Sequence, residues 1–266
     1  MPHIVLTIAG SEATGGAGAQ ADLKTFQARN VFGIAALTCI VSFDPKDNWN
    51  HRFVPIEPEV IADQLEAALT AYGPDQLNTV KIGMLGSPAT IAVVSDVLST
   101  RNFNRVVLDP VLICKGQEPG HALDTDRALK QQILPLASFV TPNHFEAIQL
   151  SGMKDINSVS DLTEAAQRIH DSSGSTVLAK GGVRLAGSEA VDVFYDGTTL
   201  EILTAPKVGE VAVSGAGCSL AAAFAAEIAK GVTPLEAAHS AKEFVHKSIT
   251  HRVSSHAPFD AVWQGN

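Results

Sequence analysis

A run of small residues that ends in a cysteine, Ser214-Gly215-Ala216-Gly217-Cys218, leads directly into an alanine-rich stretch. The pattern predicts a helix that begins inside this run. The first amides of a helix lack partners within it and carry partial positive charge, so they can bind an anion such as a phosphate. The same field favours a thiolate, which predicts a near-neutral pKa for Cys218 and a role as base or nucleophile. Read alone, the run favours a simpler interpretation, a tight helix start with a small buried cysteine.

Charged residues also come at the ends of several predicted strands. Asp109 lies within or at the end of one apolar run, Glu146 follows the next, and Lys180 ends a third. Ligands bind outside the carboxyl ends of the strands in an open parallel sheet, so we expect these side chains to meet. Carboxylates together with substrate phosphate suit Mg²⁺, and a lysine adds a point charge for phosphate. Together with the helix start at Gly217, this convergence predicts a nucleotide-dependent kinase.

Simpler interpretations stay open for the same residues. Asp109 precedes a proline and fits an Asp-Pro turn, and Lys180 fits a solvated side chain before a turn. Asn143 fits a helix N-cap, with Glu146 as its capping-box partner. Residues 16–21 match a short dinucleotide-binding pattern, but they lie too far beyond their strand and no acidic residue ends the next one.

Short apolar runs alternate with helical stretches along the chain. We expect strands at 4–9, 32–42, 79–85, 105–112, 138–141 and 176–179, and helices at 20–29, 58–71, 89–98, 125–134, 145–151 and 161–170. This alternation predicts an α/β fold whose mostly parallel sheet is covered on both faces. Asp196-Gly197-Thr198 separates two short apolar runs and predicts a hairpin, hence an antiparallel edge. Because no repeat or linker interrupts the pattern, residues 1–266 are expected to form a single domain.

Composition narrows the choice of partners. The net charge of −9 argues against a nucleic acid or an anionic membrane as the main partner. The three cysteines contain no C-x-x-C pair, which argues against a zinc ribbon or a thioredoxin-like motif. The odd cysteine count, the lack of an export-type start and the lack of an apolar run of about 18 residues predict a cytoplasmic protein.

Eight short motifs follow one another between residues 3 and 250. They are Ile8-Ala9-Gly10-Ser11, Gly15-Gly16-Ala17-Gly18, Gln20-Ala21-Asp22-Leu23-Lys24-Thr25, Lys81-Ile82-Gly83-Met84-Leu85, Leu108-Asp109-Pro110-Val111, Val140-Thr141-Pro142-Asn143, Lys180-Gly181-Gly182 and Gly215-Ala216-Gly217-Cys218. In this order they resemble the ribokinase-like vitamin kinases, in the branch of the hydroxymethylpyrimidine and phosphomethylpyrimidine kinases. The resemblance implies a three-layer α/β/α fold, ATP and Mg²⁺, and a homodimer.

Three further stretches resemble a subgroup of that branch, the pyridoxal kinases with two working cysteines. These are Cys114-Lys115-Gly116, Trp49-Asn50-His51 and residues 145–152. The resemblance implies phosphorylation of the 5′-hydroxymethyl group of pyridoxal, with pyridoxine and pyridoxamine as related acceptors. It also implies that Cys114, on a lid, adds to the aldehyde as a hemithioacetal. Cys218 would be the base, at the position where most of the wider superfamily has aspartate.

The resemblance further implies a set of site residues. The nucleotide would lie beside Lys180, Asn143, Glu146, Ser214 and Gly182. The catalytic amides would come from Gly215, Ala216 and Gly217, and the metal would be reached through Asp109 and Glu146. The vitamin would lie beside Gly10, Ser11, Gly18, Phe43, His51, Met84 and Cys114.

Three residues depart from the family pattern. Glu12 replaces the usual aspartate, and Ser214 replaces a common histidine but can still donate to phosphate. Phe43 replaces the glutamine that reads the aminopyrimidine edge, which favours pyridoxal because polar ring edges would stay unpaired. Two rival hypotheses remain open. One is a phosphomethylpyrimidine kinase of thiamine synthesis, and the other is a catalytically silent vitamin-binding protein on the same fold.

Overall fold

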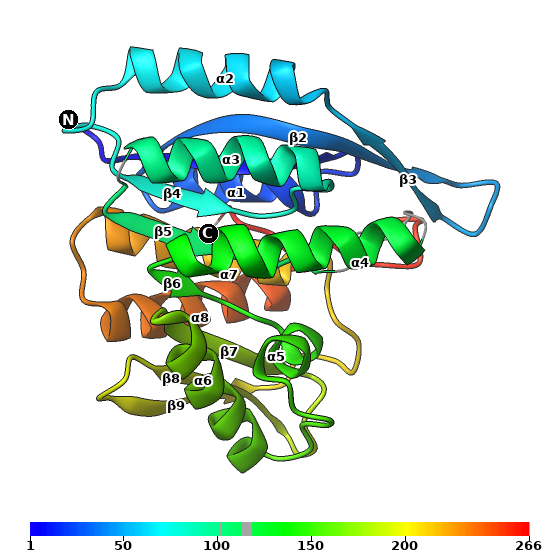
Figure 1. Cartoon of the computed structure of the whole chain (residues 1–266). Coiled ribbons are helices and arrows are strands. Elements are labelled where there is room, and N and C mark those ends of the chain that lie inside the picture. Colours follow the sequence, from blue (N-terminus) through cyan, green and yellow to red (C-terminus); the bar gives the residue numbers. More distant parts are fainter. Residues whose placement is uncertain (102, 113–118, 266) are drawn as a thin grey trace.

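One large sheet forms the centre of the computed structural model, which describes residues 1–101, 103–112 and 119–265. Within the described residues the strand order is β3-β2-β1-β4-β5-β6-β7-β8-β9 (Figure 1). The strands are β1 (Ile4–Glu12), β2 (Phe32–Asp44), β3 (Asn50–Pro55), β4 (Thr79–Ile82), β5 (Arg105–Leu108), β6 (Phe139–Val140), β7 (Thr176–Gly182), β8 (Glu189–Tyr195) and β9 (Leu200–Pro206). The strands from β2 to β7 in this order run parallel, whereas β3, β8 and β9 pair antiparallel with their neighbours.

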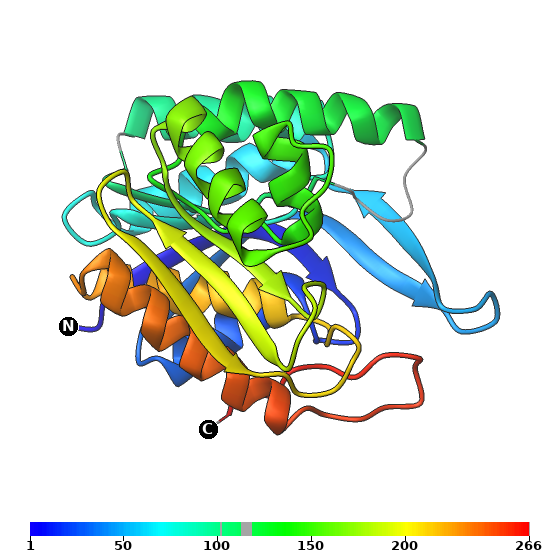
Figure 2. The ribbon, with the colours of Figure 1, turned by 90° about the horizontal axis from the view of Figure 1, so that it is seen from below.

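Helices cover both faces of this sheet, as the two views show (Figures 1 and 2). On one face lie α2 (Pro58–Ala71), α3 (Pro88–Arg101), α4 (Pro119–Ala128), α5 (His144–Ser151) and α6 (Val159–Ser173); on the other lie α1 (Gly18–Ala28), α7 (Ala216–Ala229) and α8 (Pro234–Thr250). Each face of the sheet has its own hydrophobic core, and β1 contributes to both because successive side chains of a strand point to opposite faces. Leu6 and Ile8 belong to the core under α2 to α6, and Val5 belongs to the core under α1, α7 and α8. The predicted three-layer α/β fold is confirmed.

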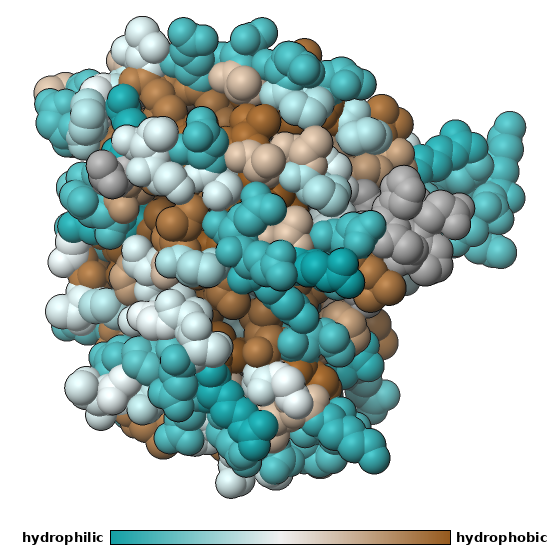
Figure 3. Space-filling model, in the orientation of Figure 1, coloured by the Kyte–Doolittle hydropathy of each residue, from teal (hydrophilic) through white to brown (hydrophobic). Residues whose placement is uncertain are grey.

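Both edges of the sheet are antiparallel, whereas only one such edge was predicted. The hairpin expected around Asp196-Gly197 is present as β8 and β9. At the opposite edge, β3 pairs with β2 and was missed because it is short and mostly exposed. The tip between them, residues 45–48, is exposed and forms a hydrophilic projection (Figure 3). This hairpin extends β2 well beyond the other strands.

Several elements end at points other than those predicted. β5 stops at Leu108 instead of residue 112, because Pro110 has no amide hydrogen to donate to a ladder. β4 stops at Ile82, three residues early. The helix expected at 125–134 begins at Pro119 and passes into a π-helical turn at Leu129–Ile133. Among the described residues, no helix has the length and apolar character needed to cross a bilayer.

Candidate active site

The carboxyl ends of the parallel strands meet along one edge of the sheet, and most predicted site residues lie there. Asp109 directly follows β5, Asn143 lies just beyond β6, and Lys180 belongs to the last part of β7. The short strands leave these positions in or beside loops. A backbone bridge joins Asn143 to Lys180. The structure therefore brings together groups that are far apart in the sequence.

A buried ion pair joins Asp109 to Lys180. The Lys180 Nζ lies 2.9 Å from Asp109 Oδ1, and Thr141 Oγ1 donates to the same oxygen over 3.4 Å. Burial opposes ionisation of Asp109, but the neighbouring lysines outweigh it and lower the pKa of that carboxyl. Burial likewise opposes the charge of Lys180, whose pKa is nevertheless raised by Asp109 and Glu146. A Cβ built on Gly217 would lie 3.3 Å from this ammonium, so the pair sits against the first turn of α7.

The start of α5 has the predicted capping box. The Glu146 amide donates to Asn143 Oδ1 over 3.0 Å, and the Asn143 amide donates to Glu146 Oε2 over 2.7 Å. Burial raises the pKa of the Glu146 carboxyl to about 8, with Lys180 opposing the shift and Asp109 adding to it. Glu146 therefore belongs to the same charge cluster as Asp109 and Lys180. The cap and a metal role are compatible, because the cap uses only one carboxylate oxygen.

Asp109 and Glu146 form a donor set that fits Mg²⁺. This ion is usually held by one or two carboxylates, with substrate phosphates and water completing its octahedron. Among the described residues, the hydrogen bonds to these carboxylates use Oδ1 of Asp109 and Oε2 of Glu146, so the second oxygen of each is the candidate ligand for a cation. Within the described part of the chain, no three His, Cys, Asp or Glu side chains are grouped as a metal site. A metal here would therefore take further ligands from a bound substrate.

Cys218 lies in the first turn of α7 and is half-buried. Burial raises the pKa of its thiol to about 11, and the carboxylates of Asp109 and Asp22 add to the shift. Lys81 and the Gly18 amide oppose it. The prediction of a near-neutral pKa is therefore wrong, because burial and two negative neighbours outweigh the helix field. The interaction with Asp109 also places the thiol in the charge cluster.

A buried network beneath Cys218 was missed from the sequence. Lys81 Nζ lies 3.0 Å from Asp22 Oδ2, and Thr7 Oγ1 donates to that oxygen over 2.6 Å. Burial raises the pKa of Asp22; it opposes the charge of Lys81, whose pKa is still raised by Asp22 and Cys218. Asp22 Oδ1 has no partner among the described residues. A lysine inside an apolar strand run was the signal that could have revealed the network.

Removal of the Lys81 charge is expected to destabilise the fold. In Lys81→Met the Asp22 carboxylate stays buried without its partner, which should lower the free energy of unfolding by about 3–5 kcal/mol. Urea denaturation measures the loss. Asp22→Asn in the same chain should recover part of it, since the amide needs no counter-charge. A loss of less than about 1 kcal/mol, typical of an exposed pair, would contradict the buried geometry.

The first loop folds around the Glu12 carboxylate. Its Oε2 accepts hydrogen bonds from the amides of Gly16 (3.0 Å) and Ala17 (3.1 Å), and Thr14 donates to both carboxylate oxygens. Glutamate in place of the family's aspartate thus serves as an internal cap for the loop. Gly18 has a φ of +63°, and a Cβ there would lie 2.3 Å from the Gly10 carbonyl oxygen. Only glycine fits this close approach.

The predicted vitamin-binding residues form one wall beside that loop. Ser11 bridges to Gly18 through the backbone, which holds the loop against β1. A Cβ on Gly10 would lie 2.5 Å from Cys39 Sγ and 3.8 Å from Met84 Sδ.

The β2–β3 hairpin continues this wall. Phe43 pairs with His51 across the hairpin, with ring centroids 4.8 Å apart. Cys39 and Phe43 lie on the same face of β2, since they are an even number of residues apart. Cys114 lies outside the described residues.

The start of α7 touches the first loop. Gly215 has a φ of +80°, and a Cβ there would lie 1.7 Å from the Gly16 carbonyl oxygen. Ser214 precedes this contact, and Ala216 is the first residue of the helix. At the end of β7, Gly182 has a φ of +54°, and no described atom lies within 4 Å of a Cβ built there. That backbone is therefore open to a ligand.

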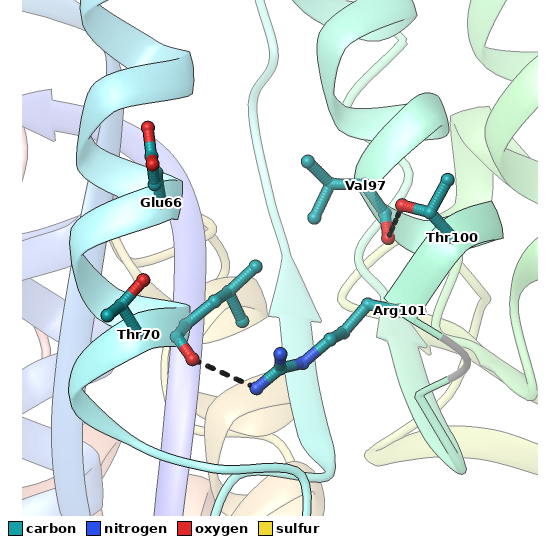
Figure 4. Close-up of a pocket in the computed structure, with 6 residues that line it drawn as sticks. Glu66, Thr70, Val97, Thr100 and Arg101 are labelled. Carbon is teal, nitrogen blue, oxygen red and sulfur yellow. Dashed lines mark hydrogen bonds between the residues drawn. The ribbon is translucent and has the colours of Figure 1, made fainter.

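A surface groove between α2 and α3 lies apart from this cluster (Figure 4). Arg101 reaches across it and donates to the Leu69 carbonyl oxygen over 3.0 Å. The groove is lined by Glu66, Leu69, Thr70, Val97, Thr100 and Arg101. None of these is a predicted site residue, so the groove is not the candidate active site.

Comparison with known proteins assigns the chain to a family. The phosphomethylpyrimidine kinase family model matches residues 12–262. The chain belongs to this family. The pyridoxine kinase of Bacillus subtilis is 44% identical over 251 residues, covering 93% of this chain and 90% of the relative. The resemblance inferred from the eight motifs is thereby confirmed.

Solved structures of this family have the same fold. The pyridoxal kinase of Staphylococcus aureus in complex with AMP-PCP and pyridoxal has a TM-score of 0.90 at 40% identity, covering 100% of this chain and 94% of that one. The ADP complex of Bacillus subtilis pyridoxal kinase has a TM-score of 0.90 at 40% identity, with 99% and 98% coverage. These relatives are phosphotransferases, and the predicted ribokinase-like fold is confirmed.

Proposed function

We propose that the protein is an ATP-dependent kinase that phosphorylates the 5′-hydroxymethyl group of pyridoxal, and also of pyridoxine and pyridoxamine. In this proposal residues 1–266 act as one kinase domain. One observation carries it: the Asp109–Lys180 pair, the first turn of α7 and the Cys218 thiol gather at one edge of the sheet. The relatives named pyridoxine kinase, and the neighbour that holds AMP-PCP and pyridoxal, support the choice of substrates.

The nucleotide phosphates would lie against the start of α7. The amides of Gly215, Ala216 and Gly217 have no partners inside the helix and would donate to the phosphate oxygens; that of Ala216 would turn from the Val213 carbonyl oxygen, to which it donates over 3.3 Å. Lys180, held beside Gly217, would add a positive charge at the transferring phosphoryl group. Mg²⁺ held by Asp109 and Glu146 would neutralise phosphate charge when bound. Asn143, Ser214 and Gly182 would flank the nucleotide.

Cys218 would accept the proton of the substrate hydroxyl. The hydroxyl oxygen forms a bond to the γ-phosphorus of ATP, and the bond from that phosphorus to the bridging oxygen breaks, releasing ADP. Lys81 and the Gly18 amide favour the thiolate that this step requires. Because a thiol base must stay reduced, the proposal includes the cytoplasmic location.

The vitamin ring would lie on the wall formed by the first loop and the β2–β3 hairpin. Gly10 and Gly18 bring backbone close to the ligand, while Ser11, Met84 and His51 border it. Phe43 offers an aromatic face and no amide. This wall suits a pyridine ring better than an aminopyrimidine, whose polar edge would lose a partner.

Cys114 is assigned to the aldehyde of pyridoxal. Cys114→Ala should raise the KM for pyridoxal about tenfold, an effect of about 1.4 kcal/mol, and leave the KM for pyridoxine nearly unchanged. Pyridoxine has no aldehyde and cannot form a hemithioacetal. Steady-state kinetics with both alcohols make the comparison. Equal losses on the two substrates would remove this assignment.

A homodimer is part of the proposal. Ile40 and Val54 pair across the β2–β3 hairpin and are 40% and 57% exposed, which gives this edge an apolar surface for a second copy. Light scattering should give a mass of about twice 27.9 kDa. Ile40→Lys should shift the protein toward the monomer. A wild-type mass equal to one chain would rule the dimer out.

The proposal is tested by ADP release with four alcohols: pyridoxal, pyridoxine, pyridoxamine and hydroxymethylpyrimidine. We expect turnover with the three vitamin B6 forms and a lower kcat/KM with the pyrimidine. The family model's description favours the second candidate, a phosphomethylpyrimidine kinase. A preference for hydroxymethylpyrimidine would select it. No ADP release with any alcohol would favour the catalytically silent vitamin-binding protein.

A further inference from the structure

The chain returns to the candidate site after α8, and its backbone binds the start of α7. The Ser214 amide donates to the Asp260 carbonyl oxygen over 2.9 Å, and the Val262 amide donates to the Ser214 carbonyl oxygen over 3.1 Å. These bonds form a parallel bridge between Ser214 and Ala261. Residues 259–264, here called the C-terminal strap, therefore fix the residue that leads into the phosphate-binding turn.

Side chains of the strap pack on the same region. An ideal Cβ on Gly16 would lie 3.0 Å from Ala261 Cβ, and one on Gly215 would lie 3.3 Å from Val262 Cγ2. Gln264 Nε2 donates to Ser219 Oγ over 3.0 Å, and this hydrogen bond is buried. The strap thus touches both the first loop and α7, the two elements that meet at Gly215.

The other end of the strap reaches the vitamin wall. The Phe259 ring lies 5.0 Å from the Phe43 ring and 6.1 Å from the Trp49 ring, between centroids. Since Phe43 also contacts His51, the four rings form one aromatic surface near the tip of the hairpin. Both views show the C-terminal part of the chain, in red, on the side of the molecule from which the β2–β3 hairpin projects (Figures 1 and 2).

The strap is held in this position by contacts of its own. Arg252 Nε donates to Asp260 Oδ2 over 2.8 Å, between the aromatic and the phosphate-facing ends. The Val253 amide donates to the Ala261 carbonyl oxygen over 2.7 Å, and the Ala261 amide donates back over 3.0 Å. A short, hydrogen-bonded segment therefore spans from the hairpin to the start of α7.

We infer that the C-terminal strap is a wall shared by both substrate sites, in which Phe259 determines vitamin binding and Ala261 positions the phosphate-binding turn. The inference rests on the proposed function, because Phe43 is assigned there to the vitamin. Phe259 extends the aromatic face offered to a pyridine ring, and aromatic rings favour offset or edge contacts with such a ring. Ala261 Cβ faces Gly16 so closely that a Cβ built on Gly16 would lie 3.0 Å from it, and we therefore expect a larger side chain at position 261 to displace the first loop.

Two substitutions in the strap should affect the KM values of different substrates. Phe259→Ala should raise the KM for pyridoxal about tenfold and leave the KM for ATP within about twofold. Ala261→Val should raise the KM for ATP several-fold with a smaller change for pyridoxal, because the added methyl groups press on Gly16. Phe259→Tyr keeps the ring and should restore the pyridoxal KM. Phe32→Ala, at an exposed ring near the start of β2, is the matched control.

The outcomes separate the inference from the proposed function. If the wild-type protein phosphorylates pyridoxal but Phe259→Ala behaves like Phe32→Ala, the inference is overturned. It is also overturned if both strap variants raise both KM values equally, as a general loss of structure would. If the wild-type protein releases no ADP with any vitamin alcohol, the proposed function fails. In that case the role of the strap is tested by measuring pyridoxal affinity from tryptophan fluorescence, and Phe259→Ala must bind pyridoxal more weakly than the wild type.

Discussion

Replacement of Cys218 by alanine is expected to lower kcat about 10²–10⁴-fold, the range for loss of a general base. The affinity for ADP should stay within about twofold. The thiol lies in the first turn of α7, but the phosphate contacts assigned to that turn come from backbone amides, which alanine keeps. Steady-state kinetics give the turnover, and calorimetric titration with ADP gives the affinity. Unchanged turnover would remove Cys218 from its assigned role.

The pH dependence provides an independent check of the same residue. The raised pKa of Cys218, about 11, means that the thiol is protonated near neutral pH. The thiolate population then grows about tenfold for each pH unit below that value, so kcat/KM should rise between about pH 7 and about pH 9. Cys218→Asp supplies a base that titrates lower, and its profile should level off at lower pH. A wild-type profile that is flat over this range would contradict a thiol base with a raised pKa.

Lys180→Met is expected to reduce kcat about 10²–10³-fold, as for loss of one preorganised charge at a reaction centre. The ammonium is held 2.9 Å from Asp109 and against Gly217, where a transferring phosphoryl group would gather negative charge. Its removal also leaves the Asp109 carboxylate buried without its partner. Both kcat and the free energy of unfolding should therefore be measured. A kcat within about threefold of the wild type would contradict the assignment.

The chain contains a matched control for this variant. Lys242 and Asp192 form an ion pair of 2.8 Å, with side chains 9% and 7% exposed, against 10% and 6% for Lys180 and Asp109. Lys242→Met should destabilise the fold by a similar amount, about 3–5 kcal/mol. This pair joins α8 to β8, and Asp192 pairs with Lys180 across the two strands, but neither Lys242 nor Asp192 is a predicted site residue. The kcat of the folded Lys242→Met protein should therefore fall far less than that of Lys180→Met. Equal losses of kcat in both variants would make the Lys180 effect structural.

The order of the elements and the residues at the strand ends could be predicted from the sequence. α2 begins and ends where predicted, at Pro58 and Ala71, because a proline at the first turn and regular apolar spacing are local signals. Asp109 and Lys180 could be placed together because parallel strands share a common carboxyl edge. β3 was not predicted, since none of its residues is buried and it is held as a strand by its pairing with β2.

The features that were missed depend on tertiary contacts. The helix field at Cys218 is visible in the sequence, but the burial and the carboxylates that raise its pKa come from α1 and the end of β5. Lys81 and Asp22 meet only after β4 and α1 pack together. Phe259 has no motif or periodicity around it, and its place beside Phe43 follows from the path of the chain after α8. Such contacts between distant segments cannot be predicted from local sequence patterns.

The most direct test is a competition between equimolar pyridoxal and hydroxymethylpyrimidine with limiting ATP and Mg²⁺, with the phosphorylated products identified by ³¹P nuclear magnetic resonance. We expect pyridoxal 5′-phosphate to be the main product of the wild-type protein and Cys218→Ala to form almost none. Phosphate found mainly on the pyrimidine, or undiminished product from Cys218→Ala, would contradict this expectation.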